Sequence, residues 1–65
     1  MEFNTIDDMK IFFDDKFKGN QIVKFKTFSG ENVSSRISEV NNTGIFILRF
    51  SGRKFYSFES IAEVL

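Results

Sequence analysis

The sequence predicts a mainly β domain with one N-terminal helix and a small, strongly bent antiparallel sheet of five strands. Two patterns carry this prediction. Apolar residues in the first eighteen positions recur at helical spacing, whereas apolar and polar residues alternate from residue 21 onward. Turn signals rich in Gly, Asn and Ser divide the alternating region into five segments. At 65 residues the chain suffices for one domain, residues 1–65, with a small core.

The helix is expected at about residues 5–18. Thr5 is a suitable N-cap, and Asp8 follows it in the first turn, where an acidic side chain suits the positive end of the helix dipole. Gly19 is predicted to end the helix. One apolar stripe is expected to face the sheet, at Ile6, Met9, Phe13 and Phe17.

The strands are expected at about residues 21–28, 33–40, 45–50, 53–58 and 61–65. In the first strand, alternation places Val23, Phe25 and Thr27 on one face. The third segment is the most apolar and is flanked by glycines, which predicts a buried central strand. Short connections between antiparallel strands favour a strongly bent sheet that approaches a small barrel.

The side-chain inventory argues against an enzyme. The chain has no Cys and no His, which removes the commonest zinc ligands and the commonest general base. Paired carboxylates occur at residues 7–8 and 14–15, but adjacent positions of a helix do not converge on one point. We therefore expect no catalytic residues, no metal site and no cofactor.

Charge and hydropathy predict a soluble, cytoplasmic protein. Nine basic and nine acidic residues give a net charge of zero, which excludes a strongly basic nucleic-acid coat but allows a local basic face. No segment has the roughly 18–20 apolar residues that span a bilayer, and the first residues do not resemble a secretory signal. We expect no membrane partner.

Phenylalanine is in excess, with ten residues in a domain that has little interior. Each ring buries about 150–250 Å² when it is covered. Several rings are therefore expected either to be exposed or to be covered by a partner, and self-association would cover them. An AT-rich genome, which favours Phe codons, is the alternative explanation.

The predicted order of elements resembles the Sm-like (LSm/Hfq-type) fold, in which five bent strands follow an N-terminal helix. Residues 22–30 and 33–37 are similar to the first family motif, which consists of a strand, a glycine turn and a second strand. Residues 56–64 resemble the fourth-strand, corner and fifth-strand signature of the bacterial Hfq branch. The chain resembles a divergent member, because Ser57 and Phe58 stand where Hfq-type proteins carry Lys-His.

The resemblance implies a homo-oligomeric ring of about five to seven subunits, closed by pairing the fourth strand of one subunit with the fifth strand of the next. It also implies binding of single-stranded, U- or A-rich RNA, in RNA metabolism or riboregulation. The residues that it implies at the RNA site are Asn41, Asn42, Tyr56, Ser57 and Phe58. Arg53 and Lys54, beside the third predicted turn, are candidates for phosphate contacts.

Two alternatives remain open from the sequence. Residues 41–44 can be a plain hairpin turn, Phe58 can be a core residue, and the chain can close its own barrel. The chain can also be a small protein-interaction module of SH3-like barrel shape, for example phage-encoded, that docks on a host protein through exposed Phe and does not bind RNA.

Overall fold

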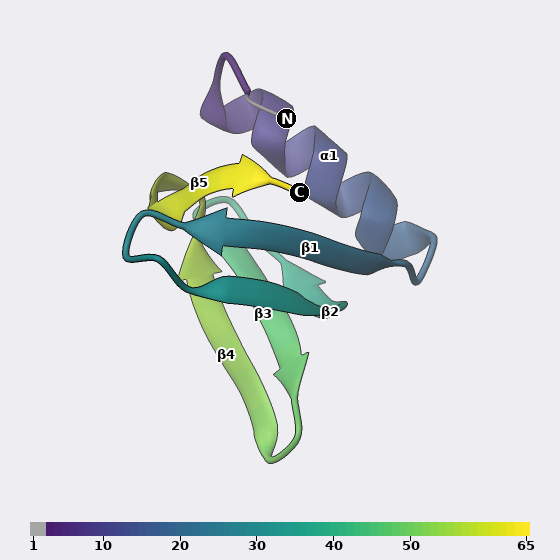
Figure 1. Cartoon of the computed structure of the whole chain (residues 1–65). Helices are drawn as coiled ribbons and strands as arrows, with labels where there is room; N and C mark the ends of the chain where they lie inside the picture. The colour runs from purple at the N-terminus through teal and green to yellow at the C-terminus, as the bar shows by residue number, and fades with distance from the viewer. Residues whose placement is uncertain (1–2) are drawn as a thin grey trace.

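The computed structural model describes residues 3–65 as one helix and a single five-stranded sheet (Figure 1). Its elements are α1 (Ile6–Lys18), β1 (Ile22–Thr27), β2 (Asn32–Val40), β3 (Gly44–Arg49), β4 (Gly52–Ser57), the short 3₁₀ helix η1 (Phe58–Ser60) and β5 (Ile61–Val64). This order confirms the predicted fold class. The strand ends differ from the predicted ones by at most one residue, within the usual scatter of element boundaries.

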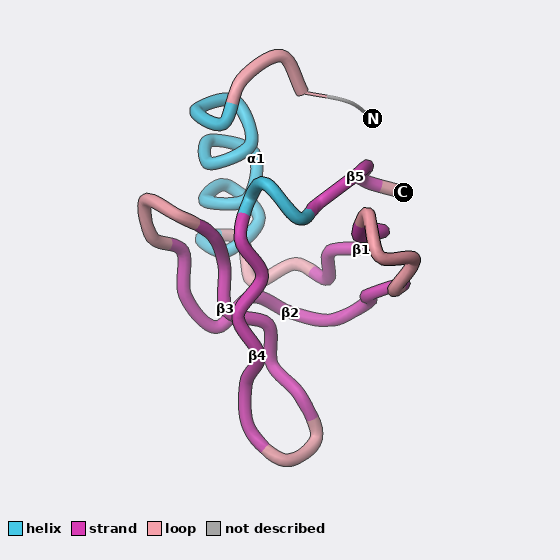
Figure 2. The backbone as a smooth tube through the Cα atoms, turned by 90° about the vertical axis from the view of Figure 1, so that its left-hand side faces the viewer, coloured by secondary structure: helices cyan, strands magenta, loops and turns pink. Residues whose placement is uncertain are grey.

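The strands lie in the order β4-β3-β2-β1-β5, and every neighbouring pair is antiparallel. β2 therefore holds the central position, and the apolar segment β3 is an interior strand beside it. The register shifts between Lys26 and Thr27 and between Ile37 and Glu39, and such bulges bend a sheet. Figure 2 shows the resulting curl of the backbone. No ladder joins β4 to β5 among residues 3–65, so the sheet stays open.

The core lies between α1 and the concave face of this sheet. β1 alternates between exposed and buried residues as predicted, with Val23, Phe25 and Thr27 inside. The helix contributes Phe13, whose ring centroid lies 5.9 Å from that of Phe25. Packing of aromatic rings across the two layers therefore fixes the helix on the sheet.

The helix begins as predicted, because the Thr5 hydroxyl accepts a hydrogen bond from the Asp8 amide at 3.1 Å. It also ends as predicted, at Lys18 with Gly19 as the C-cap. Gly19 keeps a helical conformation, and Asn20 takes the left-handed one with φ 51°. The amides of Asn20 and Gln21 donate to the carbonyls of the last turn, which is a Schellman ending with Asn in the usual place of Gly.

The predicted apolar stripe of α1 is only half correct. Met9 and Phe13 are buried, whereas Ile6 and Phe17 are 42% and 39% exposed. Several Phe rings lie at the surface of the chain, as expected if they are either exposed or covered by a partner: Phe28, Phe50 and Phe55 do so in addition to Phe17.

Candidate functional site

Two segments of the predicted RNA site meet at one end of the β3–β4 hairpin. In the β2–β3 turn, the side-chain oxygen of Asn41 accepts hydrogen bonds from the amides of Thr43 (2.9 Å) and Gly44 (3.0 Å) and so holds the turn closed. The Thr43 carbonyl accepts a hydrogen bond from the Phe58 amide at 3.0 Å. Asn41 and the Ser57–Phe58 segment, far apart in sequence, therefore form one small surface.

Asn42 is the most accessible predicted residue on this surface. Its side chain is exposed, and its Oδ1 accepts a hydrogen bond of 2.5 Å from Lys10 Nζ. Lys10 thus brings a cation from α1 to the turn. No local sequence pattern reveals Lys10, because the contact spans 32 residues and depends on how the helix lies on the sheet.

Tyr56 and Phe58 do not lie where a base could stack on their rings. Phe58 belongs to η1 rather than to the fourth strand, and it is 1% exposed in the core. Tyr56 is 5% exposed, and its hydroxyl is bonded to Glu31 and Arg49. Neither ring has a free face in the subunit. We expect both rings to pack beneath the surface formed by Asn41 and the Ser57–Phe58 segment. For Phe58, this replaces the expectation of a contact with a base.

The remaining predicted residues lie elsewhere. Ser57 is half-buried beside the turn, and its carbonyl accepts a hydrogen bond of 2.7 Å from Ser60 Oγ. Arg53 lies four residues back along β4, about 13 Å away at the rise of a strand. Its guanidinium stacks over the Phe46 ring at 4.4 Å and lies 3.4 Å from Glu39. Lys54 points to the other face, because neighbouring residues of a strand alternate.

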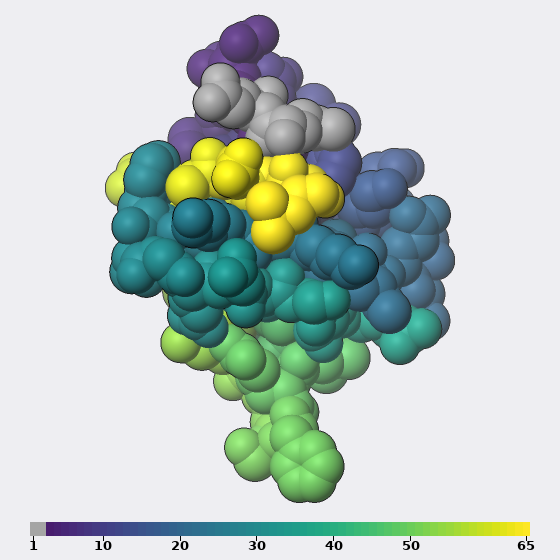
Figure 3. Space-filling model, viewed as in Figure 1, coloured from purple at the N-terminus to yellow at the C-terminus, as the bar shows by residue number. Residues whose placement is uncertain are grey.

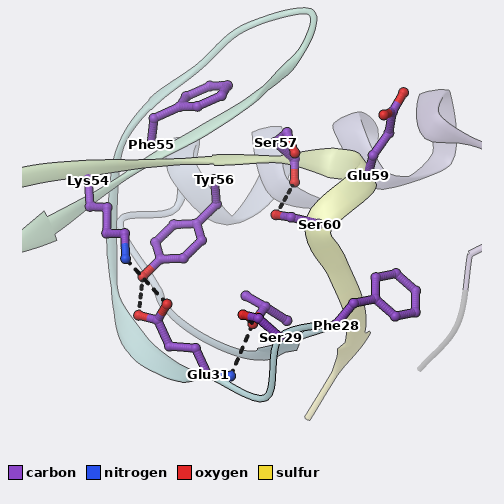
Figure 4. Close-up of a pocket in the computed structure, with 10 residues that line it drawn as sticks. Phe28, Ser29, Glu31, Lys54, Phe55, Tyr56, Ser57, Glu59 and Ser60 are labelled. Atoms are coloured by element: carbon purple, nitrogen blue, oxygen red, sulfur yellow. Dashed lines mark hydrogen bonds and ion pairs between the residues drawn. The ribbon is translucent and has the colours of Figure 1, made fainter.

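Lys54 belongs to a polar cluster around the carboxylate of Glu31 (Figure 4). This carboxylate accepts hydrogen bonds from the Tyr56 hydroxyl, from Arg49 Nη2 at 2.6 Å and from Lys54 Nζ at 3.3 Å. Arg49 Nη2 also donates to the Tyr56 hydroxyl. The cluster ties the β1–β2 turn to β3 and β4. Beside it runs an open groove of about 540 Å³, bordered among others by Phe28 and Phe55.

The cluster shifts the acidity of its members. The hydrogen bond from Tyr56, followed by the one from Arg49, holds the pKa of the Glu31 carboxyl below its ordinary value of 4.5. Burial, followed by the bond to Glu31, raises the pKa of the Tyr56 hydroxyl above its ordinary value of 10.0. With these two pKa shifts, the Glu31 carboxyl stays charged and the Tyr56 phenol stays neutral at neutral pH.

The lowered pKa of Glu31 predicts a pH-dependent difference between the wild type and Glu31→Gln. A group with a lowered folded-state pKa stabilises the fold above its unfolded pKa and loses this effect as the pH falls through the folded value. We expect Glu31→Gln to lower the urea midpoint at about pH 7, and the gap to the wild type to narrow below about pH 4.5. Urea unfolding followed by circular dichroism across this pH range measures the gap between the two midpoints. A gap that stays constant down to about pH 2 would contradict this account.

The residues that the structure describes hold no group of three or more acidic side chains arranged to bind a metal ion. Within the same residues, no helix has the length and apolar character that crossing a membrane requires.

Comparison with known proteins gives no family and no relative: no family model matches the chain, and no curated protein matches it. What the chain shares with the Sm-like family is its topology, an N-terminal helix followed by a five-stranded antiparallel sheet, which is consistent with Sm-like architecture.

Proposed function

We propose that copies of this chain join through β4 and β5 into a homo-oligomeric ring of about five to seven subunits that binds single-stranded RNA. The observation that carries this proposal is the open sheet, in which β4 and β5 are the two edges. Each edge strand presents backbone groups that can pair with another chain. Head-to-tail pairing that closes on itself satisfies all of these edges at once.

A ring repeats the Asn41–Asn42 turn once in each subunit. The amide group of Asn42 offers both a donor and an acceptor, which suits the edge of uracil or adenine. Lys10 lies at hydrogen-bonding distance from Asn42 and supplies a cation for a neighbouring phosphate. Repetition around the ring multiplies a weak contact, because every further contact of the same strand is intramolecular. U- or A-rich single strands are the RNA class that fits.

Assembly can be tested at Leu65, which follows β5. The Leu65 side chain is 63% exposed in the subunit, although its amide bonds to Lys24 of β1 at 2.8 Å. We expect Leu65→Asp to weaken association by about 1.5–3 kcal/mol per interface, the value of burying such a side chain, and to leave the subunit folded. Analytical ultracentrifugation over a concentration series measures this shift.

The matched control is Ile11→Asp, which makes the same kind of change on the helix at 68% exposure. We expect it to leave the assembly unchanged. A wild-type chain that sediments as a monomer at micromolar concentration would contradict the ring, and so would equal effects of the two variants.

RNA recognition can be tested at Asn42. We expect Asn42→Ala to weaken binding of oligo(U) or oligo(A) by at least about 1 kcal/mol, the value of a lost hydrogen bond, without changing the oligomeric state. Asn42 is preferable to Asn41, because the side chain of Asn41 holds the turn itself. Fluorescence anisotropy with labelled oligonucleotides measures the affinity, and equal affinities would remove Asn42 from the site.

A small protein-interaction module is the second candidate, and the groove beside Glu31 favours it. Phe28 is 76% exposed and Phe55 40% exposed, and both residues border this groove next to the β4 edge. A protein that docks there would cover the Phe28 ring. This candidate predicts a monomer or dimer without salt-dependent affinity for oligonucleotides.

A further inference from the structure

A second groove lies at the far end of β3, away from the Asn41–Asn42 turn. It measures about 440 Å³ and is bounded by β1, β2 and the tip of the β3–β4 hairpin. The hairpin projects from the body of the molecule, as Figures 1 and 2 show in outline. Figure 3 shows this projection as a narrow extension below the sheet.

One side of the groove is cationic. Arg36 and Arg49 both line it, and no acidic residue is among its lining side chains in the described part of the chain. Arg36 uses Nε to donate to the Asn20 carbonyl at 3.3 Å. Arg49 uses Nη2 to bind Glu31 and Tyr56. Arg49 is therefore already paired with a carboxylate, whereas Arg36 retains donors for an anion within the described residues, since a guanidinium carries five N–H donors.

The other side of the groove is apolar and exposed. Phe50 at the hairpin tip is fully exposed, with a relative accessibility of 109%, and Leu48 and Ile22 beside it are 47% and 53% exposed. The register holds Ile22 opposite Arg36, so cation and apolar surface lie on adjacent strands. Ser34 adds an exposed hydroxyl next to the arginines.

The ligand must therefore combine an anionic group with a flat apolar group a short distance away. A nucleotide has both, because its phosphate suits the fork of an arginine and its base can stack on an aromatic ring. A phosphorylated peptide offers the anion but not the flat ring next to it. A lipid surface offers the anion and apolar chains, but it would meet a concave groove rather than an exposed plane.

We propose that this groove binds one nucleotide of a single-stranded nucleic acid, with the phosphate on Arg36 and the base on Phe50. The site lies within one subunit. It does not require the ring or the Asn41–Asn42 turn, and it stands if either of these is wrong.

The test uses the full chain and a fluorescein-labelled five-nucleotide strand, oligo(A) or oligo(U), followed by anisotropy. Phe50→Ser is expected to weaken binding by about 5- to 100-fold, as loss of one stacked base does. Arg36→Gln is expected to weaken binding and to reduce the slope of log affinity against log salt by about 0.7, whereas Phe50→Ser leaves this slope unchanged. The matched controls are Phe17→Ser and Lys18→Gln, which remove a partly exposed Phe and an exposed cation on the helix. Both are expected to bind as the wild type does.

The effect of Phe50→Ser is also expected in the Leu65→Asp background, which separates this groove from the ring. Because Phe50 is exposed, the urea midpoint of Phe50→Ser should equal that of the wild type, so lost binding will not reflect unfolding. Wild-type affinity of both groove variants would overturn the proposal, as would the absence of oligonucleotide binding. If inorganic phosphate competes with the oligonucleotide but Phe50→Ser has no effect, the groove binds phosphate only, and the assignment of a nucleotide is overturned. Cosedimentation with phosphatidylserine vesicles that depends on Phe50, without oligonucleotide binding, would assign the tip to a membrane instead.

Discussion

Replacement of Phe13 with alanine is expected to remove most of the stability of this domain. Phe13 is fully buried, and its ring contacts four others, those of Phe3, Phe12, Phe25 and Phe58. Loss of a buried Phe costs about 3–5 kcal/mol, because both the transfer free energy and the packing of the neighbours are lost. A 65-residue domain has a free energy of unfolding of about 3–10 kcal/mol in total. Urea unfolding followed by circular dichroism should show a midpoint near zero denaturant.

Phe17→Ala is the matched control on the same helix. Phe17 is 39% exposed, and alanine is the better helix former, so we expect a loss of about 1 kcal/mol or less. Similar losses for the two variants would mean that α1 does not use Phe13 as its anchor on the sheet.

Gly44→Ala is expected to cost about 3 kcal/mol or more, although it adds a single methyl group. A Cβ at this position would overlap the Tyr56 carbonyl oxygen and lie 2.8 Å from both Phe55 Cζ and Ser57 Cα. Two of these atoms belong to the β4 backbone, which cannot yield without separating the strands. Since Gly44 pairs with Ser57, the damage would reach the Asn41–Asn42 turn. Thermal or urea unfolding of the variant measures the loss.

Gly19→Ala controls for the removal of a glycine as such. Gly19 has φ −82°, which any residue adopts, and the nearest atom to an added Cβ is the end of the Gln21 side chain at 3.0 Å. That flexible side chain can move aside, so we expect a change within about 0.5 kcal/mol. If Gly19→Ala were as damaging as Gly44→Ala, close approach of β4 would not explain the need for Gly44.

The local features of this fold were readable from the sequence, because they depend on neighbours in the chain. The Thr5 cap and the alternation of β1 are of this kind. The end of β4 could not be predicted from the sequence, because residues 53–58 continue an alternating pattern. Phe58 leaves the strand because its amide bonds to Thr43 and its ring enters the core, and both partners lie far away in sequence.

The candidate sites likewise combine features that the local sequence predicts with features that depend on distant residues. The Asn41–Asn42 turn and the cations around the β3–β4 turn could be identified from residue types alone. That Ser57 lies beside the Asn41–Asn42 turn could not be identified in this way, because it follows from the register of the hairpin, in which Gly44 pairs with Ser57. The bonds between Glu31 and Tyr56 span 25 residues, and the second groove takes Ile22, Arg36 and Phe50 from three segments. No local pattern marks such combinations.

The two free edges of the sheet differ in the sign of their charge. β4 carries Arg53 and Lys54 and no acidic residue, whereas β5 carries Glu63 and no basic residue. Two β4 edges that approach each other therefore repel, while β4 and β5 attract. In the proposed ring, this difference would favour head-to-tail contacts over a two-fold pair of like edges.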